Sequence, residues 1–331
     1  MDAGLLVSLR DTEGVADMKA FAIDEFGQPG SLHDVPVPEP AEGQVRVRVA
    51  AAGLNPFDNA VVLGYMKDRM KHSFPLVPGM DGSGTVDAVG SGVSAWSVGD
   101  EVFGSVGKGH LGEGTLAELV NMSVGTIARK PSMIEHATAA AIPTAGVTAL
   151  NVADALALGE GKTVVAVGAT GGVGSYLVQL AARRGARVVA VCRGENADYA
   201  RRLGAADVVD YMGGDAAEAV RSAFPDGIDA IADMHGDKEG VARLAEQVRS
   251  GGHVASIVGA VDAESLGDRG IQATNVMGRV TTGSLEALLS MLVAREIAAP
   301  EIRSFSLAEA GDALAAVATH HVRGKIVVTM S

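Results

Sequence analysis

Cysteine is nearly absent from this chain, since Cys192 is the only one among 331 residues. One cysteine excludes an internal disulfide and every zinc site that is built from several thiolates. A chain without disulfides suits a reducing compartment, so we expect a cytoplasmic protein. Cys192 ends an apolar run that resembles a strand, where cysteine is more often a small buried residue than a nucleophile. We therefore assign it no chemistry.

Aromatic residues and positive charges are also scarce. Aromatic residues make up 4% of the chain, against 43 glycines and a hydrophobic fraction of 47%. Small and β-branched side chains must therefore fill the core, as in α/β folds with close contact between helices and sheet. The net charge is −13. Because nucleic acids and anionic membranes are bound through Lys and Arg, we expect neither as a partner.

Targeting and membrane-spanning segments are lacking as well. The first residues, "MDAGLLVSLRDTEGVAD", have no basic segment ahead of a long apolar run, so residues 1–17 are predicted to be a flexible extension rather than a signal peptide. The apolar stretch 164–182 is interrupted by glycines, which favours a buried strand and its helix over a membrane span.

The pattern of apolar residues changes along the chain. The first third holds short β-rich runs such as "QVRVRVAAAGL", separated by glycine turns, which predicts an irregular or barrel-like sheet. From Thr163 onward, β-branched runs alternate with helical segments, including 173–184, 198–203, 216–224 and 238–248. This alternation is typical of a doubly wound parallel sheet, and the length suits about two domains.

A glycine-rich loop, "GATGGVGS", lies between the first of these strands and its helix. Glycines at this place allow a tight turn, close approach of the backbone to a pyrophosphate, and close packing of helix on strand. The helix N-terminus then presents free N–H groups and its positive dipole end to the anion. The residues predicted to bind a dinucleotide here are Gly168, Gly171, Gly172, Val173 and Gly174.

The second strand of this unit ends at Arg193, where sites for NAD usually carry an acidic residue that holds the ribose 2′-OH. A guanidinium suits a 2′-phosphate, so NADPH is the predicted cofactor. Glu195, two residues further on, keeps NADH open, and Arg193 could also be an ordinary surface residue.

These features together resemble the medium-chain dehydrogenases/reductases, and more narrowly their zinc-independent quinone oxidoreductase branch. The resemblance covers Met18 to Met330 and rests on "AAGLNPFDNAVVLGY", "FPLVPGMDGSGTVDAVGSGV", "WSVGDEVFG", "IPTAGVTAL", "GATGGVGS", "RRLGAADVVDY" and "VRGKIVV". It implies a Rossmann nucleotide-binding domain over 143–277. That domain is expected to be inserted into a β-rich, GroES-like barrel catalytic domain formed by 18–142 and 278–331, with the active cleft between them.

The same resemblance implies further site residues. Asn55 corresponds to a contact with the nicotinamide ribose, although an Asn before Pro56 could simply form a turn. Thr148 is placed to contact the phosphate or nicotinamide end, and Tyr211 and Lys325 to approach the adenosine phosphate. Tyr65 is the candidate proton donor, with a packing role as the alternative. The last predicted member of the cofactor-binding set is Gly259.

A departure from the zinc-dependent relatives bears on mechanism. Those relatives carry His-Glu after "PG" and a cysteine in the preceding loop, whereas this chain has Met80-Asp81 and Pro56-Phe57-Asp58. Without thiolate and imidazole ligands we expect no metal, and we expect structural hydrogen-bonding roles for Asp58 and Asp81. His235 is a candidate for the wall of the cleft. His320 and His321 are expected to point apart at a solvated helix end.

Without zinc, the expected chemistry is hydride transfer from NADPH to an already polarised acceptor, either a quinone or an α,β-unsaturated carbonyl. Two alternatives stay open: an enoyl-thioester reductase of a polyketide-like pathway, and an NADP-binding protein with a structural or sensing role and little turnover. We also expect a homodimer joined along the open sheet edge near "IQATNVMGRV".

Overall fold

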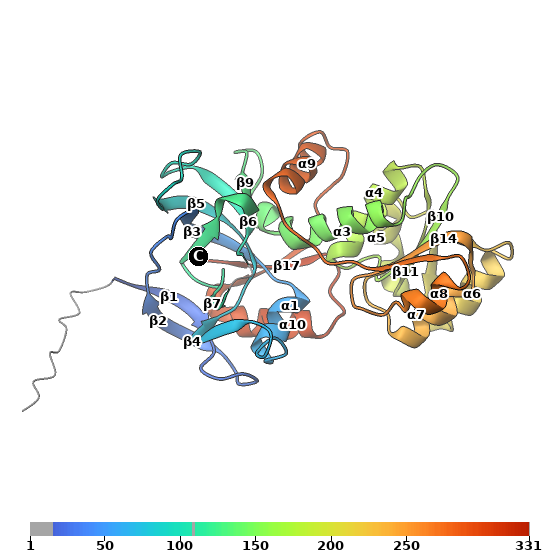
Figure 1. Cartoon of the computed structure of the whole chain (residues 1–331), viewed down its shortest axis with the longest axis horizontal. Coiled ribbons are helices and arrows are strands. Elements are labelled where there is room, and N and C mark those ends of the chain that lie inside the picture. Colours follow the sequence, from blue (N-terminus) through green and yellow to red (C-terminus); the bar gives the residue numbers. More distant parts are fainter. Residues whose placement is uncertain (1–15, 108–109, 331) are drawn as a thin grey trace, which may run out of the picture.

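The structure is a computed structural model that describes residues 16–107 and 110–330. The extension predicted over 1–17 therefore lies outside the described residues, apart from its last two positions. The described chain forms two lobes side by side, and each is built around its own sheet (Figure 1). The predicted fold class, a Rossmann domain within a GroES-like catalytic domain, is confirmed. No helix in the described part of the chain is long and apolar enough to span a membrane.

The first lobe surrounds a seven-stranded sheet of order β16-β17-β3-β5-β6-β9, with β8 also paired to β3. Two-stranded sheets, β1-β2 and β4-β7, flank it. The elements of this lobe are β1 (Asp17–Ala22), β2 (Ser31–Pro36), β3 (Gln44–Gly53), α1 (Pro56–Val62), β4 (Lys71–Val77), β5 (Asp81–Val89), β6 (Glu101–Ser105), β7 (His110–Glu113), β8 (Leu119–Ser123), β9 (Ile127–Arg129), α2 (His136–Ala140), α9 (Thr282–Val293), β16 (Ile302–Ser306), α10 (Ala310–Ala318) and β17 (Lys325–Thr329).

The described chain begins and ends in this lobe. Strand β17 pairs antiparallel with β3, so that Val328 lies opposite Ala52. The chain therefore leaves the first lobe, builds the second, and returns to complete the first sheet. This return brings the residues just after β3 close to the start of β17.

The second lobe contains a six-stranded, all-parallel sheet of order β12-β11-β10-β13-β14-β15. From β10 the strand order reverses, because β11 pairs on one side of it and β13 on the other. Ligands bind at such a switch point in doubly wound sheets. The elements of this lobe are α3 (Pro143–Ala155), β10 (Thr163–Val167), α4 (Gly172–Arg183), β11 (Arg187–Cys192), α5 (Ala197–Arg202), β12 (Asp207–Asp210), α6 (Ala216–Ala223), β13 (Ile228–Asp233), α7 (Lys238–Ala245), β14 (Val248–Ser256), α8 (Ala263–Gly267) and β15 (Gln272–Asn275).

A shared hydrophobic core joins the two lobes. Helix α3 lies along α4 and has eight buried residues. Its core cluster includes Phe103 from the first lobe, Leu177 from the second, and Leu285 and Leu288 from α9. Burial of such side chains contributes roughly 1.5–3 kcal/mol each. The relative position of the lobes, and hence the shape of the cleft between them, is therefore set by packing rather than by a linker.

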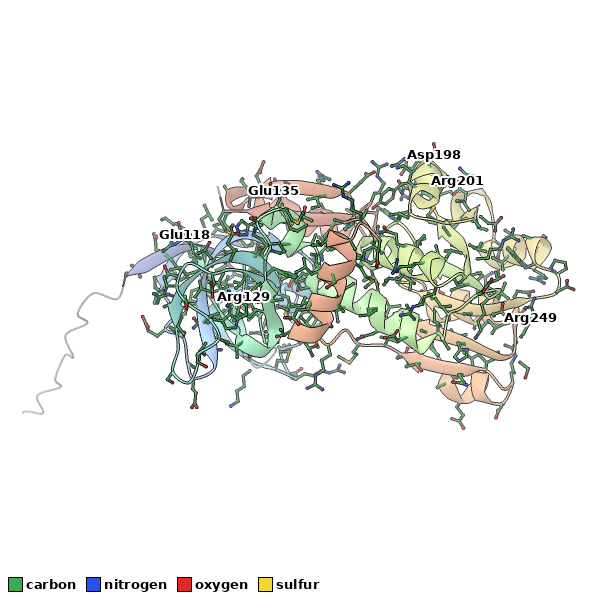
Figure 2. The ribbon with its side chains drawn as sticks, turned by 90° about the horizontal axis from the view of Figure 1, so that it is seen from above. Glu118, Arg129, Glu135, Asp198, Arg201 and Arg249 are labelled. Atoms are coloured by element: carbon green, nitrogen blue, oxygen red, sulfur yellow. The ribbon has the colours of Figure 1, made fainter. Side chains whose placement is uncertain are left out.

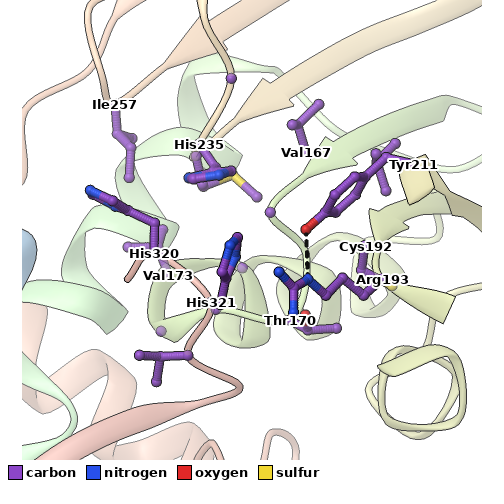
Figure 3. A pocket seen from close by; sticks show the side chains of 18 of the residues that line it. Val167, Thr170, Val173, Cys192, Arg193, Tyr211, His235, Ile257, His320 and His321 are labelled. Carbon is purple, nitrogen blue, oxygen red and sulfur yellow. Dashed lines mark hydrogen bonds between the residues drawn. The ribbon is translucent and has the colours of Figure 1, made fainter. Parts of the chain in front are cut away.

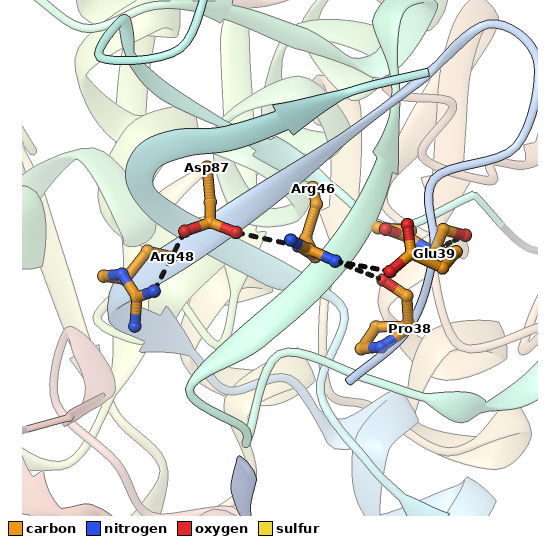
Figure 4. A network of polar contacts seen from close by, with 6 residues as sticks. Pro38, Glu39, Arg46, Arg48 and Asp87 are labelled. Atoms are coloured by element: carbon orange, nitrogen blue, oxygen red, sulfur yellow. Dashed lines mark hydrogen bonds and ion pairs between the residues drawn. The ribbon is translucent and has the colours of Figure 1, made fainter. Parts of the chain in front are cut away.

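Charged side chains lie mostly over the outside of both lobes (Figure 2). One ordered group crosses β3 and β5, where Asp87 accepts hydrogen bonds from Arg46 Nε at 2.8 Å and from Arg48 Nη2 at 2.9 Å (Figure 4). Arg46 Nη1 also reaches the Pro38 carbonyl at 3.3 Å and Glu39 at 3.2 Å. The group fastens the segment before β3 to the sheet, although exposed pairs of this kind add only about 0–1 kcal/mol each.

Two tyrosines of the second lobe allow a matched test of its core. Tyr176 is fully buried and its hydroxyl has no partner among the described residues. The Tyr199 hydroxyl donates to Ser175 Oγ at 3.1 Å and accepts from the backbone N–H of Glu301 at 3.1 Å. An unpaired buried hydroxyl costs desolvation energy that a paired one recovers.

We expect Tyr176→Phe to leave the free energy of unfolding unchanged or to raise it by about 1 kcal/mol, and Tyr199→Phe to lower it by about 1–2 kcal/mol. Urea unfolding of both variants and of wild type provides the measurement. Equal losses in the two variants would mean that the Tyr176 hydroxyl has a partner after all.

Candidate active site

A cavity of about 600 Å³ lies between the two lobes, at the carboxyl ends of β10, β11 and β13 (Figure 3). Both lobes contribute to its wall, which matches the switch point of the parallel sheet. The predicted site residues that line it are Asn55, Gly168, Gly171, Gly172, Val173, Gly174, Arg193, Tyr211, His235 and Lys325.

The glycine loop lines the floor of the cavity in the predicted manner. Gly168 has φ +76°, a left-handed conformation that favours glycine. A Cβ on Gly174 would lie 2.2 Å from the Gly168 carbonyl oxygen, so only glycine lets the loop fold onto the start of α4. Gly171 caps this helix without a side-chain hydrogen bond. The first N–H groups of α4 are thus available to an anion.

Arg193 and Tyr211 stand together at one end of the cavity. Arg193 Nε donates a hydrogen bond to the Tyr211 hydroxyl at 3.1 Å (Figure 3). Glu195 lies 3.7 Å from the same guanidinium, but its side chain is 71% exposed and it is not part of the cavity wall. The cavity wall therefore includes the guanidinium of Arg193 but not the carboxylate of Glu195. Burial raises the pKa of the neighbouring Cys192 thiol.

At the other end, a buried polar network joins the two lobes. Asn55 donates through Nδ2 to Asp81 at 3.0 Å and accepts through Oδ1 from Lys325 Nζ at 2.6 Å. Lys325 also donates to the Leu54 carbonyl at 2.6 Å. Asp81 accepts from the Thr144 hydroxyl at 2.7 Å and from the Thr144 N–H at 3.0 Å. Every partner comes from a different segment of the chain, except Leu54 and Asn55.

Burial shapes the ionisation of this network. It lowers the pKa of Lys325, and the charges of Asp81 and Asp58 oppose that shift. Burial raises the pKa of Asp58 to about 7, although the Asn55 N–H, which bonds one of its oxygens at 2.7 Å, works in the other direction. The other oxygen of Asp58 has no hydrogen-bond partner among the described residues. The hydrogen-bonding role predicted for Asp58 and Asp81 matches these contacts.

The residues at this end do not fit a catalytic zinc. The Lys325 ammonium, 4.0 Å from Asp81, already supplies a buried positive charge, and the side chain at position 80 is a methionine. Among the described residues no group of three or more His, Cys, Asp or Glu side chains is arranged to hold a metal ion. A tetrahedral zinc needs such a set of thiolate, imidazole or carboxylate ligands.

Three predicted site residues lie away from the cavity. Tyr65 is 72% exposed and follows Gly64, which has φ +78°, just after the end of α1. Thr148 lies one helical turn beyond Thr144, under Gly278, where a Cβ would come within 2.1 Å of its hydroxyl oxygen. Gly259 has a positive φ in an open turn after β14. None of the three is among the described residues that line the cavity, and the roles predicted for them stay predictions.

Lys325, which is predicted to approach the adenosine phosphate, lines the cavity. Its ammonium donates to Leu54 and Asn55 of the catalytic lobe, and its role toward the cofactor stays a prediction. Its aliphatic stem passes beneath the glycine loop, where a Cβ on Gly172 would lie 3.3 Å from Lys325 Cδ. The same network contains Thr144, which sequence reasoning missed because no local motif marks it.

His320 and His321 require a correction. They were expected to point apart at a solvated helix end, but both line the cavity, facing His235 (Figure 3). The reason is that α10 ends at Ala318 and His320 takes a left-handed conformation with φ +56°, so helical geometry does not apply to the pair.

Fold and cavity together define a two-domain protein with a Rossmann-type domain and a cleft at the switch point of its parallel sheet. The chain matches the family patterns "Alcohol dehydrogenase GroES-like domain" over residues 41–132 and "Zinc-binding dehydrogenase" over 172–288. It is 31% identical to the NADPH-dependent alkenal/one oxidoreductase of Arabidopsis thaliana chloroplasts over 321 residues, which cover 94% of this chain and 79% of the relative. The chain belongs to the medium-chain dehydrogenase/reductase family, as predicted.

Other relatives fit the same branch. The chloroplast envelope quinone oxidoreductase homolog of Arabidopsis thaliana is 38% identical over 192 residues, covering 56% of this chain and 58% of the relative. The chain spans about six tenths of the length of the first curated relatives it matches, at 58%, 63% and 55%. Among solved structures, the quinone oxidoreductase of Coxiella burnetii has a TM-score of 0.86 and 29% identity, covering 95% of this chain and all of the other.

The raised pKa of Asp58 predicts a specific dependence of stability on pH. Between pH 3.8, the ordinary pKa of an aspartate, and about 7, the folded chain binds more protons than the unfolded one, so this carboxyl makes stability fall as pH rises through that window. Asp58→Asn removes the titration but keeps an oxygen that can accept from the Asn55 N–H.

We therefore expect the free energy of unfolding to fall less steeply with pH in Asp58→Asn than in wild type, by up to about 1.4 kcal/mol per pH unit. Urea unfolding at several pH values across this window measures the slope. The exposed Asp68→Asn serves as the control. Parallel slopes in wild type and Asp58→Asn would show that folding does not raise the pKa of Asp58.

Proposed function

We propose that this chain is an NADPH-dependent oxidoreductase that transfers hydride to a quinone or an α,β-unsaturated carbonyl and uses no zinc. The observation that carries the proposal is the pair of cavity ends: a glycine loop with Arg193 and Tyr211 at one, and a buried ammonium–amide–carboxylate network at the other. The names of the relatives agree, because they include quinone oxidoreductases, an alkenal/one oxidoreductase and a 2-methylene-furan-3-one reductase.

The residues present fit a dinucleotide. A pyrophosphate would be held by the glycine loop and the free N–H groups of α4, where a Cβ on Gly174 would close the space. Arg193 and Tyr211 would hold a 2′-phosphate, because a guanidinium and a hydroxyl both donate to phosphate oxygens. Asn55 and Lys325 would face the opposite part of the cofactor.

The bound dihydronicotinamide would supply the hydride, so the chain must orient the acceptor, exclude water and stabilise the negative charge that forms on the acceptor. Apolar side chains such as Leu54, Ile257 and Ile326 form much of the cavity wall and limit access of water. Negative charge grows on the acceptor oxygen as a carbonyl or quinone is reduced. Lys325 carries a buried ammonium whose lowered pKa favours proton donation, and it can stabilise that charge. Asp81 and Asn55 hold this ammonium in place.

The function is tested by NADPH oxidation with a panel of quinones, free enones and enoyl thioesters, using protein purified without added metal. We expect quinone or enone reduction that survives chelation, with a zinc content far below one per chain. Preference for the thioester would favour the enoyl-thioester reductase. Cofactor binding without turnover on any acceptor would favour a sensing role, and zinc-dependent activity would contradict the proposal.

A matched pair of buried lysines sharpens this test. Lys130 is as buried as Lys325, with side-chain exposures of 3% and 4%, but it pairs with Glu101 outside the cavity. We expect Lys325→Met to lower kcat by about 10²-fold or more, and Lys130→Met to lower it little once folding is confirmed. Equal effects on kcat in the two folded variants would argue against a role for Lys325 in the reaction.

Cofactor choice is tested at Arg193. A charge-assisted hydrogen bond is worth about 1.5–3 kcal/mol, so Arg193→Ala should weaken NADPH binding by roughly one to two decades and NADH binding much less. Arg201 is the control, since it lies on α5 outside the cavity, paired with Asp198 (Figure 2). Fluorescence titration measures both cofactors. Equal losses for NADPH and NADH, or equal wild-type affinities, would contradict the assignment.

A homodimer formed along β15 is part of the proposal. This strand is at the edge of the six-stranded sheet, so one row of its backbone groups has no strand partner within the described part of the chain. Large apolar side chains near this edge are exposed, with Met277 at 80% and Val258 at 50%. We expect light scattering to give twice the mass of one chain at micromolar concentration. A monomeric mass would contradict the proposal, and Met277→Glu should shift the equilibrium toward monomer.

A further inference from the structure

Three imidazoles surround the middle of the cavity. His235 follows β13, while His320 and His321 belong to the connection between α10 and β17 (Figure 3). The rings of His235 and His320 have centroids 5.6 Å apart. All three side chains are exposed to the cleft, and within the described part of the chain their ring nitrogens make no hydrogen bond. Such nitrogens are free to bind a ligand.

The end of α10 places these histidines on the cavity wall. His320 has φ +56°, the left-handed conformation in which many helices end, and Ala157 and Arg295 adopt it in the same way after α3 and α9. The chain then turns toward β17, and both His320 and His321 line the cavity.

The permanent cations of the cavity leave much negative charge on a dinucleotide phosphate unmatched. Arg243 is paired with Asp215, and Lys325 donates to Asn55 and Leu54 at the opposite end of the cavity. Among the described Lys and Arg side chains that line the cavity, this leaves Arg193 for a phosphate, and Arg193 itself lies 3.7 Å from Glu195. A 2′-phosphate by itself carries close to two negative charges.

We propose that His320 and His321, assisted by His235, are phosphate-binding residues of the cofactor site, and that binding of the cofactor takes up protons onto these imidazoles. The inference rests on the proposed function, since it concerns the same cavity. An imidazole gains a proton near neutral pH when an anion approaches, and it then donates through both nitrogens. The ligand class is a dinucleotide phosphate, and its affinity should rise as pH falls.

Other charged groups near the three histidines influence the pKa of His235. Desolvation and the positive charges of His320 and His321 lower the pKa of His235, while Asp233 opposes that shift. Asp233 is itself engaged by Ser256 and by the backbone N–H groups of His235 and Gly236. The other titratable or charged side chains that line the same cavity are Cys192, Arg193, Tyr211, Asp215, Asp237, Arg243 and Lys325, and Asp233 acts on His235. His321 also lines a neighbouring cavity with Glu195, Glu301, Arg303 and Arg323.

The test is calorimetric titration of NADPH into wild type and into the double variant His320→Asn/His321→Gln, in buffers of different ionisation enthalpy. Asn tolerates the left-handed conformation at position 320, and Gln keeps a polar side chain of similar size. The dependence of the heat on the buffer gives the number of protons taken up. His253→Gln, on β14 and outside the cavity, is the control. Comparison at one pH removes the contribution of the phosphate itself.

We expect proton uptake in wild type and in His253→Gln, and a clear loss of it in the double variant. A rise of about one pKa unit on binding corresponds to about tenfold in affinity, so wild-type affinity should fall by several-fold to tenfold as pH rises from below to above neutral. The double variant should show a flatter dependence. Equal proton uptake and equal pH dependence in both would overturn the inference and leave the proposed function intact. Absence of NADPH binding in wild type would overturn both.

Discussion

The buried ammonium of Lys325 is the constraint on which the rest of the site depends. Lys325 and Asp81 are 4% and 0% exposed, and a charge so far from water must be compensated. The compensation comes from Leu54 and Asn55 after β3, from Asp81 at the start of β5, and indirectly from Thr144 at the start of α3. Removing one member would leave an uncompensated buried charge, which costs about 3–5 kcal/mol. The sheet order of the first lobe therefore has a chemical reason as well as a packing one.

The same ammonium connects the catalytic lobe to the glycine loop. The stem of Lys325 lies against Gly172, and the N–H of the adjacent Gly324 donates to the Thr170 carbonyl at 2.8 Å. The end of the chain thus touches the pyrophosphate-type loop on one side and the Asn55 network on the other. Both ends of the cavity are fixed by one short segment, so their separation is a property of the fold. A cavity of fixed length selects a ligand of matching length.

A feature of this molecule could be predicted from the sequence when the residues that form it lie close together along the chain. The alternation of strands and helices and the loop 168–174 are local patterns, so fold and loop were both predictable. The network was not, because Lys325 and Asn55 are separated by 270 positions and no local pattern pairs them. Tyr65 stays a prediction, because its 72% exposure gives its position in this chain but not whether it meets a substrate. His320 and His321 were misjudged because helical geometry was carried beyond the end of α10.

The cleft between the lobes must also be stable when no anionic ligand is bound. Permanent cations facing one another across a narrow, partly dry cleft repel, and each needs a counter-charge of its own, as Arg243 has in Asp215. Histidines avoid that cost because they can stay neutral until an anion arrives and then become donors. A chain with net charge −13 and only 27 Lys and Arg residues would gain most from this arrangement, because its surface already repels an anionic ligand. Placing titratable rather than fixed charge at the centre of the cavity then lets the binding of the phosphate itself create the positive charge that holds it.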